Sequence, residues 1–195
     1  MYPKKIQDLI EDFSRLPGIG NKAAERIVMH LLSINDNNFV RNFSENLKNI
    51  YLDIKKCSNC FMYTDQELCF ICLDQTRDQT IIMVVADAKD LIMIEKTKSY
   101  HGLYHVLGGL IDYTKGIDEE KLTINNLSKR LINVQELIIA TNATVEGEIT
   151  ALFLANFFQN TLVTRIAYGL PFGADFKYTD DKTIKIAVNN RRKVS

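Results

Sequence analysis

Two stretches of hydrophobic residues at helical spacing open the chain, and a glycine-rich turn separates them. The apolar positions of the first stretch are Ile6, Leu9, Ile10, Phe13 and Leu16. Those of the second stretch are Ala23, Ala24, Ile27, Val28, Leu31 and Leu32. This period predicts two amphipathic helices between residues 4 and 32, and a similar period over 39–54 predicts a third.

Beyond residue 77 the chain alternates continuous apolar runs with helical patterns. The runs at 81–85 and 137–140 are wholly apolar, which is typical of strands buried on both faces, and a third strand is expected at 162–167. Strands that alternate with helices predict an α/β domain with a mostly parallel sheet. A short helix is expected within 179–193, and it ends in a basic tail that is either solvated or in contact with phosphate.

These patterns divide the chain into four segments. We expect a helical domain at 1–54, a cysteine-rich module at 55–77, the α/β domain at 78–175 and a C-terminal helical segment at 176–195. With 46% hydrophobic and 25% charged residues, the composition is that of an ordinary globular protein. No apolar run approaches the length of a membrane span and no signal peptide is visible, so we expect a cytoplasmic protein without a membrane partner.

The cysteines carry the strongest chemical signal in the chain. All four lie in one segment, as Cys57-x2-Cys60 and Cys69-x2-Cys72. Each CxxC turn can aim two thiolates at one point, so the two pairs complete a tetrahedral ligand set for Zn(II). With every ligand supplied by the protein, one zinc ion per chain would be structural and not catalytic. Two disulfides or four buried thiols are the alternatives, although disulfides suit a secreted protein.

The turn between the first two helices has the composition of a phosphate-binding hairpin. Gly18-Ile19-Gly20 lets the chain turn tightly, and backbone N–H groups then lead into a helix N-terminus, which favours anions. Lys22 and Arg26 are four residues apart and lie on one face beside it. Because such contacts reach the phosphate backbone, we expect binding of single- and double-stranded DNA that is independent of sequence. Lys+Arg and Asp+Glu both number 24, so local groups must supply the attraction.

Two other interpretations of this turn stay open. Gly18-x-Gly20-x-x-Ala23 partly matches a dinucleotide-binding fingerprint, but that motif requires a preceding strand, and here a helix and Pro17 precede it. The second alternative is a plain pair of helices with solvated charges. One hairpin would bind DNA weakly, so several copies on an oligomer would be needed for useful affinity.

Polar residues gather where the expected strands end. Asp87 follows the first strand, while Glu146 and Glu148 follow the second, together with Asn142 and Thr144. Because the functional crevice of an open α/β sheet lies at the carboxyl ends of its strands, the three acidic residues are candidate partner contacts. Asp87 can equally cap the helix that follows it, and Glu146 and Glu148 can be charges that favour the start of a helix.

Several segments together resemble the RecR family of bacterial recombination mediators. They are Leu16–Gly20, the cysteine signature from Cys57 to Arg77, Gly102–Gly109, Thr141–Glu148 and Arg165–Pro171. Their order is that of the family over nearly the whole chain. The resemblance implies a helix-hairpin-helix bundle, a four-cysteine zinc module and a Toprim domain, which is the fold shared by topoisomerases and bacterial primases.

The resemblance also bears on catalysis. Catalytic Toprim domains are similar to one another in a Glu after the first strand and an Asp-x-Asp after a later one, which hold Mg(II). Ala86, Asn142 and Thr144 stand at those positions here, so we expect no enzyme and no catalytic residue. The alternative is a Mg-dependent Toprim nuclease or RNA-processing enzyme that uses Glu146 and Glu148.

For partners, the resemblance implies DNA, RecO and, in some bacteria, RecF, with the chain helping to load the recombinase RecA onto single-stranded or gapped DNA. It further implies a homo-oligomer, a dimer or tetramer that forms a ring or clamp, associated with the nucleoid. The zinc site would be a metal staple between the DNA-binding helices and the Toprim domain. His101 and His105 are expected to serve packing or an interface.

Overall fold

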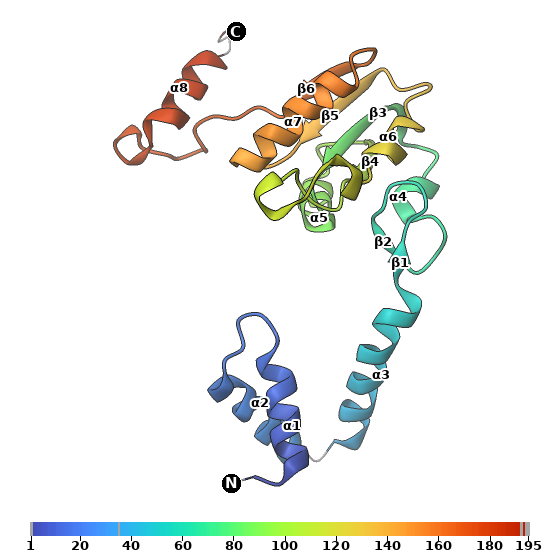
Figure 1. Ribbon diagram of the computed structural model, residues 1–195, viewed down its shortest axis with the longest axis vertical. Coiled ribbons are helices and arrows are strands. Elements are labelled where there is room, and N and C mark those ends of the chain that lie inside the picture. The colour runs from blue at the N-terminus through green and yellow to red at the C-terminus, as the bar shows by residue number, and fades with distance from the viewer. Residues whose placement is uncertain (1, 35, 192, 194–195) are drawn as a thin grey trace. The chain divides into compact units, whose positions relative to one another are not determined.

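The computed structural model describes residues 2–34, 36–191 and 193, which divide into two compact units, 1–54 and 55–195 (Figure 1). The first unit is helical, and the second holds the cysteine module and a mixed α/β domain. The expected fold class is therefore confirmed. No helix among the described residues is both long enough and apolar enough to cross a membrane.

The first unit consists of α1 (Lys4–Ser14), α2 (Asn21–Ser33) and α3 (Asn37–Asp53). The first two helices pack against each other through the apolar stripes that the sequence shows. The third begins two residues before the apolar period because Asp36 caps it and accepts hydrogen bonds from the Asn38 and Phe39 N–H groups.

This helical unit has almost no core of its own. Within its described part, Ala24 and Val28 of α2 are the fully buried hydrophobic residues. The third helix instead exposes a series of apolar side chains, namely Phe39, Val40, Phe43, Leu47, Ile50, Tyr51 and Leu52. So few buried side chains cannot offset the entropy of ordering three helices, and the unit therefore needs a further surface to pack against.

The second unit is built on a four-stranded parallel sheet in the order β4-β3-β5-β6. The strands are β3 (Asp78–Val85), β4 (Gly102–Val106), β5 (Glu136–Ala140) and β6 (Leu162–Arg165). Three of them were expected, and the last is two residues shorter than the sequence indicates. The remaining strand, β4, is buried along its whole length and was not expected.

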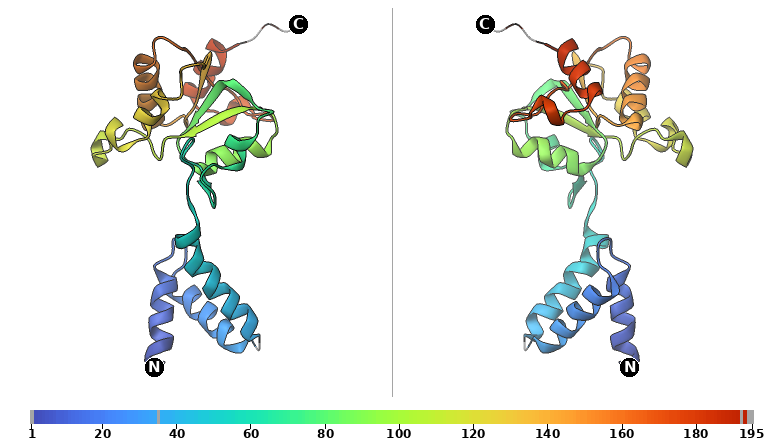
Figure 2. Two further views of the ribbon diagram at one scale, coloured as in Figure 1. Left: turned by 90° about the vertical axis from the view of Figure 1, so that its right-hand side faces the viewer. Right: turned by 90° about the vertical axis from the view of Figure 1, so that its left-hand side faces the viewer.

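Alternation along β3 sends its side chains to two separate clusters. Ile82 and Val84 join the cluster that α6 (Ile124–Ser128) and α7 (Val145–Phe157) cover. Met83 and Val85 join the cluster on the opposite face, which α5 (Ala88–Lys96) and the cysteine module cover. Helices lie on both faces of the sheet (Figure 2). A strand covered on both sides must be apolar throughout, as the run at 81–85 is.

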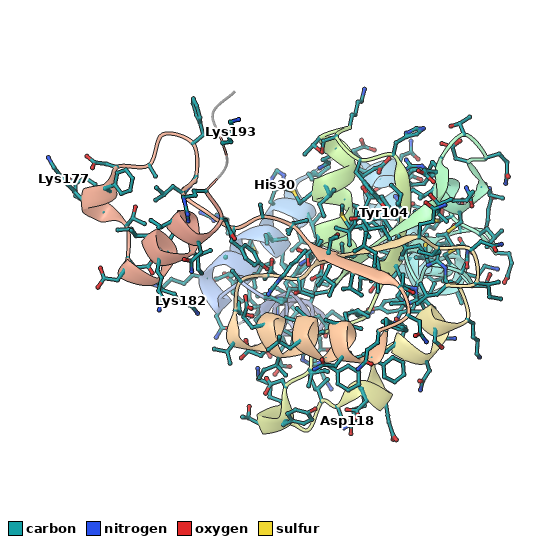
Figure 3. The ribbon with its side chains drawn as sticks, turned by 90° about the horizontal axis from the view of Figure 1, so that it is seen from above. His30, Tyr104, Asp118, Lys177, Lys182 and Lys193 are labelled. Atoms are coloured by element: carbon teal, nitrogen blue, oxygen red, sulfur yellow. The ribbon has the colours of Figure 1, made fainter. Side chains whose placement is uncertain are left out.

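Shorter elements complete the second unit. The cysteine module contains an antiparallel pair, β1 (Lys55–Lys56) and β2 (Tyr63–Thr64), and one helical turn. That turn is α4 (Phe70–Leu73), and the remaining helical segments are α5 (Ala88–Lys96), η1 (Tyr113–Lys115), η2 (Glu119–Lys121), η3 (Phe176–Tyr178) and α8 (Asp181–Asn189). Figure 3 shows Tyr104 of β4 inside this unit and Asp118 on the segment between η1 and η2.

The C-terminal segment is held to the sheet by few contacts. Its helix α8 begins after Asp180, whose carboxylate accepts the Thr183 N–H, and it buries no residue. The Asn190 side-chain N–H donates to the Tyr168 carbonyl oxygen over 3.1 Å. Lys177 and Lys182 project from this segment (Figure 3). Of the basic tail, Arg192 lies outside the described residues.

Candidate zinc centre and nucleic-acid interface

The first CxxC pair sits on a tight turn that fixes both sulfurs. The Phe61 N–H donates to the Cys57 carbonyl oxygen over 3.0 Å, and the Cys57 N–H donates to the Met62 carbonyl oxygen over 2.7 Å. Phe61 adopts a φ of 65°, in the left-handed region that glycine usually occupies. A bulky residue persists there because its ring packs edge-on against His105, with centroids 5.4 Å apart.

The second pair completes the cluster. The sulfur atoms of Cys57, Cys60, Cys69 and Cys72 all lie within 4.8 Å of one another, and those of Cys60 and Cys69 are 3.4 Å apart. A zinc ion with Zn–S bonds of about 2.3 Å requires tetrahedral edges of about 3.8 Å, so the four sulfurs fit this metal. Elsewhere in the described chain, no other set of three or more potential ligands is close enough to share an ion.

Without metal, the thiols depend on one another for hydrogen bonds. Hydrogen bonds from Cys60 and Cys72 lower the pKa of Cys69, and the hydrogen bond to Cys69 raises the pKa of Cys60. The Cys69 N–H donates to the Cys57 sulfur over 3.3 Å, which favours a thiolate there. Zinc binding would replace the shared protons and keep all four sulfurs as thiolates.

The zinc module is continuous with the core of the α/β domain. Three of its cysteines belong to the same buried cluster as Met83 and Val85 of the sheet. The Val106 N–H, at the end of β4, donates to the Cys60 carbonyl oxygen over 2.9 Å. Arg77 connects the end of the module to α5 and β4, because its buried guanidinium pairs with Glu95 of α5 and donates to the Gly102 carbonyl oxygen. The metal therefore stabilises this side of the sheet directly.

His105 connects the zinc module to the sheet without binding metal. Its side chain is completely buried, and Arg130 Nη1 donates to its Nδ1 atom over 3.0 Å. Its Nε2–H therefore donates to the Thr123 hydroxyl oxygen, 2.8 Å away, while that hydroxyl donates to the Val106 carbonyl oxygen. Burial and the neighbouring Arg130 lower the pKa of His105 to about 3. The packing role expected for this histidine agrees with these contacts.

The glycine hairpin leaves the start of α2 open. Gly18 has a φ of 81°, the Ile19 N–H donates to the Leu16 carbonyl oxygen, and Gly20 stands at the N-cap. No described side chain caps this helix, so the first N–H groups of α2 face outward together with the positive end of the helix dipole. Lys22 and Arg26 are exposed on the first two turns.

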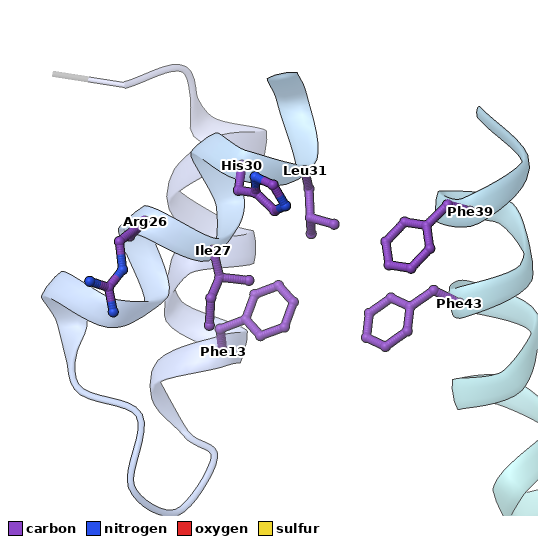
Figure 4. Close-up of a pocket in the computed structure, with 7 residues that line it drawn as sticks. All are labelled: Phe13, Arg26, Ile27, His30, Leu31, Phe39 and Phe43. Carbon is purple, nitrogen blue, oxygen red and sulfur yellow. The ribbon is translucent and has the colours of Figure 1, made fainter. Parts of the chain in front are cut away.

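An apolar pocket of about 470 Å³ is lined by residues of all three helices of this unit. In Figure 4, Phe39 and Phe43 of α3 point across it toward Phe13 and Leu31. The residues that line it are Phe13, Arg26, Ile27, His30, Leu31, Phe39 and Phe43. Phe39 and Phe43 of α3 thus belong to one apolar surface with residues of α1 and α2.

The candidate partner residues lie at the carboxyl ends of two neighbouring strands. The parallel pairing of β3 with β5 brings Asp87 and the segment from 141 to 148 to the same edge of the sheet. Asp87 caps α5 and accepts hydrogen bonds from the Lys89 and Asp90 N–H groups, over 2.8 and 3.0 Å. The Thr144 hydroxyl caps α7 by accepting the Gly147 N–H over 3.1 Å. Both side chains are therefore part of the helix starts.

The start of α7 is packed too tightly for a side chain at position 147. A Cβ atom on Gly147 would lie 2.0 Å from the Asn142 carbonyl oxygen. The buried Thr141 hydroxyl donates to the Gly147 carbonyl oxygen over 2.9 Å and holds this approach. Glycine is required here because the backbone of the strand end meets the backbone of the helix.

The two glutamates on α7 have different surroundings. Glu148 pairs with Arg165 of β6 over 2.5 Å, and the Arg165 guanidinium lies 4.6 Å above the Tyr168 ring. Glu146 is half-buried and lies near Lys115, whose pKa is raised first by its hydrogen bond to Asp112 and further by Glu146. The side chains of Asp87, Thr144 and Glu148 are therefore engaged in helix caps or an ion pair at this edge. Among the described residues, the weakest interaction is that of Glu146, which is attracted to Lys115.

Sequence reasoning missed several residues that build the zinc surroundings. Thr123 and Arg130 lie near a short helix without a clear apolar period, and neither gave a signal. Strand β4 was hidden because Gly102, Tyr104 and His105 interrupt its apolar pattern. A buried strand could have been suspected here, because the segment directly follows a helix and a turn in a chain that alternates strands and helices.

Fold and site together define a Toprim-domain protein that carries a helical hairpin and a four-cysteine zinc centre. Four family models match the sequence: the RecR helix-hairpin-helix at 6–50, the RecR four-cysteine zinc finger domain at 54–74, the Toprim domain at 80–167 and the RecR C-terminal region at 169–192. The zinc-finger match and the sulfur geometry make the cysteine cluster a structural site for one zinc ion per chain.

Curated relatives extend this result over the whole chain. A "Recombination protein RecR" of Phytoplasma mali is 44% identical over 95% of this chain and 93% of the relative. Proteins of the same name from Lactococcus lactis subsp. cremoris (strain SK11) and Desulfitobacterium hafniense (strain Y51) are each 43% identical, over 99% of this chain and 99% and 98% of the relatives. The chain belongs to the RecR family of recombination proteins, and the predicted resemblance is confirmed.

Removal of zinc should loosen the second unit. Structural zinc sites contribute several kcal/mol, and a loss of about 5 kcal/mol at about 3 °C per kcal/mol would lower the melting temperature by about 15 °C. Circular dichroism melts with and without a strong chelator measure the shift, and added zinc should reverse it. A melting temperature that does not change on chelation would contradict a structural role.

The pKa of His105 predicts acid sensitivity. The unfolded chain takes up a proton at this histidine below a pH of about 6.5, whereas the folded chain keeps it neutral down to about pH 3. Protonation therefore favours unfolding, and this residue should lower the free energy of unfolding by about 2 kcal/mol between pH 7 and pH 5.

Denaturant titrations at both pH values measure that change, with zinc content followed in parallel. In His105→Gln the acid-dependent part should be smaller by this amount. An equal pH dependence in both proteins at equal zinc content would show that His105 is not the titrating group.

Proposed function

We propose that this chain is a DNA-binding recombination mediator in DNA repair and that it acts in the cytoplasm at the nucleoid. The observation that carries the proposal is the open N-terminus of α2, where the turn Gly18-Ile19-Gly20 leads into a helix whose first backbone N–H groups have no side-chain cap and lie beside two exposed cations. The names of the relatives, which are all recombination proteins, support the same role.

Binding at this hairpin would be directed at phosphate. Backbone N–H groups and a helix dipole stabilise an anion, and Lys22 and Arg26 add charge without reading a base edge. The interface would therefore accept single- and double-stranded DNA of any sequence, and its affinity would fall with salt.

Charge reversal at the hairpin should abolish most of this binding. In Lys22→Glu/Arg26→Glu, the loss of two phosphate contacts should weaken single-stranded DNA binding at least about tenfold and lower the salt slope by about 1.4 per engaged chain. Fluorescence anisotropy over a salt series measures both quantities.

The matched control is Lys96→Glu/Lys98→Glu, which makes the same change in net charge at the exposed end of α5. It should bind DNA nearly as the parent protein does. If both double variants lose affinity equally, the contact is general electrostatic attraction and the hairpin assignment is wrong.

We also propose that the chain forms a homo-oligomer, a dimer or a tetramer, through its helical unit. The support is the apolar surface around Phe13, Leu31, Phe39 and Phe43, together with the near absence of a core among the described residues of this unit. A second copy that covers this surface would supply the missing burial. Several hairpins on one assembly would then raise the effective affinity for a DNA strand.

A charge on this surface should shift the oligomer toward the monomer. Phe43→Glu places a carboxylate among the rings and should lower the mass measured by light scattering by half or more at micromolar concentration. Asn42→Glu introduces the same charge at the adjacent residue, which is exposed, and should leave the measured mass unchanged. A Phe43→Glu protein with the parent mass would place the interface elsewhere.

Within repair, we propose that the chain acts with RecO, and with RecF where it is present, to load RecA onto single-stranded or gapped DNA. The partner surface would be the carboxyl edge of the sheet, with Asp87, Glu146 and Glu148 as acidic contacts. This edge belongs to the Toprim domain, for which we propose the bounds 78–175, after a zinc module at 55–77 and the helical domain at 1–54. The C-terminal segment would be 176–195.

The same edge supports a role without catalysis. Asn142 and Thr144 bring no negative charge, and the Thr144 hydroxyl is already the cap of α7. Glu148 is paired with Arg165, and Asp87 caps α5. A hard dication such as Mg(II) prefers several carboxylate oxygens, and these side chains are engaged elsewhere. We propose that the chain binds and recruits but does not cleave.

A further inference from the structure

The zinc centre has a charge that its surroundings must accommodate. One Zn(II) ion and four thiolates carry a formal charge of −2 together. Cys57 and Cys60 have no exposed surface, and Cys69 is 1% exposed. A double negative charge at such a depth is unfavourable unless nearby groups compensate for it.

Two neutral donors reach the sulfurs but leave the net charge in place. The Cys69 N–H donates to the Cys57 sulfur over 3.3 Å, and the Asn59 side-chain amide donates to the Cys72 sulfur over 3.7 Å. Such dipoles orient the ligands, but only a cation can cancel a net charge.

Arg130 is a cation that enters this region from the α/β domain. Its Nη1 atom donates to the Tyr104 carbonyl oxygen over 2.8 Å and to His105 Nδ1 over 3.0 Å. Its Nη2 atom is buried and has no hydrogen-bond partner among the described residues. Arg130 also lines the same hollow, of about 350 Å³, as Asn59, the residue that donates to the Cys72 sulfur.

Electrostatics agree with this placement. Burial lowers the pKa of Arg130, whereas each of the four cysteines, when ionised, raises it. Arginine stays protonated in either case, so Arg130 is a partly buried cation that thiolate charge stabilises. Attraction between the guanidinium and the cluster would offset the desolvation of both.

We infer that Arg130 is the partly buried counter-ion of the zinc–tetrathiolate cluster and that it holds the metal site to the Toprim sheet. His105 fixes its position, because the Nε2–H bond to Thr123 leaves Nδ1 free to accept from Arg130. Arg130 is thus a positioning residue for zinc that acts from outside the ligand set, and it couples metal retention to the segment between α6 and β5.

The competing explanation is that Arg130 only ties the Tyr104 carbonyl to the end of α6. That role would stabilise the fold equally with and without metal. The two explanations differ in zinc affinity, so the test must measure metal binding and not stability alone.

Zinc affinity is measured by competition with a chromophoric chelator, on the full chain. Arg130→Met removes the charge but keeps most of the side-chain volume, and it should weaken zinc binding about 10- to 100-fold, the usual range for residues that support metal ligands. Lys129→Met removes the adjacent exposed charge and should leave the affinity within about twofold of the parent. An unchanged affinity in Arg130→Met would overturn the inference.

A second comparison separates charge from hydrogen bonding. Arg130→Lys keeps the charge but loses the planar fork, so it should retain zinc much better than Arg130→Met. If the lysine and methionine variants lose zinc equally, the charge is not the cause and the inference is wrong. Should Arg130→Met fail to fold, Arg130→Gln takes its place, since it keeps a donor for the Tyr104 carbonyl oxygen, and the same two outcomes decide.

Discussion

The burial of four thiol groups at one point is the constraint on which the second unit depends. Packed sulfurs that share protons form a poor core, whereas a metal turns the same atoms into a rigid tetrahedron. That tetrahedron occupies the place where an ordinary α/β domain would put further hydrophobic side chains on its sheet. Met83, Val85 and Val106 pack against the cysteine module as they would against a helix. The zinc module is therefore one layer of the α/β domain.

A second constraint shapes the carboxyl edge of the sheet. In this fold the edge offers a place for a metal, yet its polar side chains here form caps and ion pairs. Gly147 brings the strand and helix backbones together, Thr141 and Thr144 fix that approach, and Arg165 holds Glu148. These contacts make the edge rigid, and a rigid edge would suit the partner surface proposed above.

The sequence predicted the features that local chemistry controls. The spacing of the cysteines, the apolar runs at 81–85 and 137–140 and the cap at Asp87 depend on near neighbours, and the structure agrees with each. It could not predict Arg130 beside the zinc centre, because that placement depends on a contact between β4 and the end of α6. It also missed β4, where Gly102 lies against Ile81 and where the Tyr104 carbonyl and the His105 ring both accept from Arg130, so each meets a partner distant in the sequence. The left-handed Phe61 was equally invisible, since a distant histidine ring makes it acceptable.

The scarcity of buried side chains in the helical unit has a consequence for control. If a second copy of the chain covers this unit, as proposed, its folding obeys mass action and its folded fraction depends on the concentration of chains. At low abundance the glycine hairpin would be loosely ordered and its anion site poorly formed. As chains accumulate, assembly and the ordering of the α2 N-terminus would increase together. The amount of protein in the cell would then act as a threshold for engaging DNA, with no ligand or modification required.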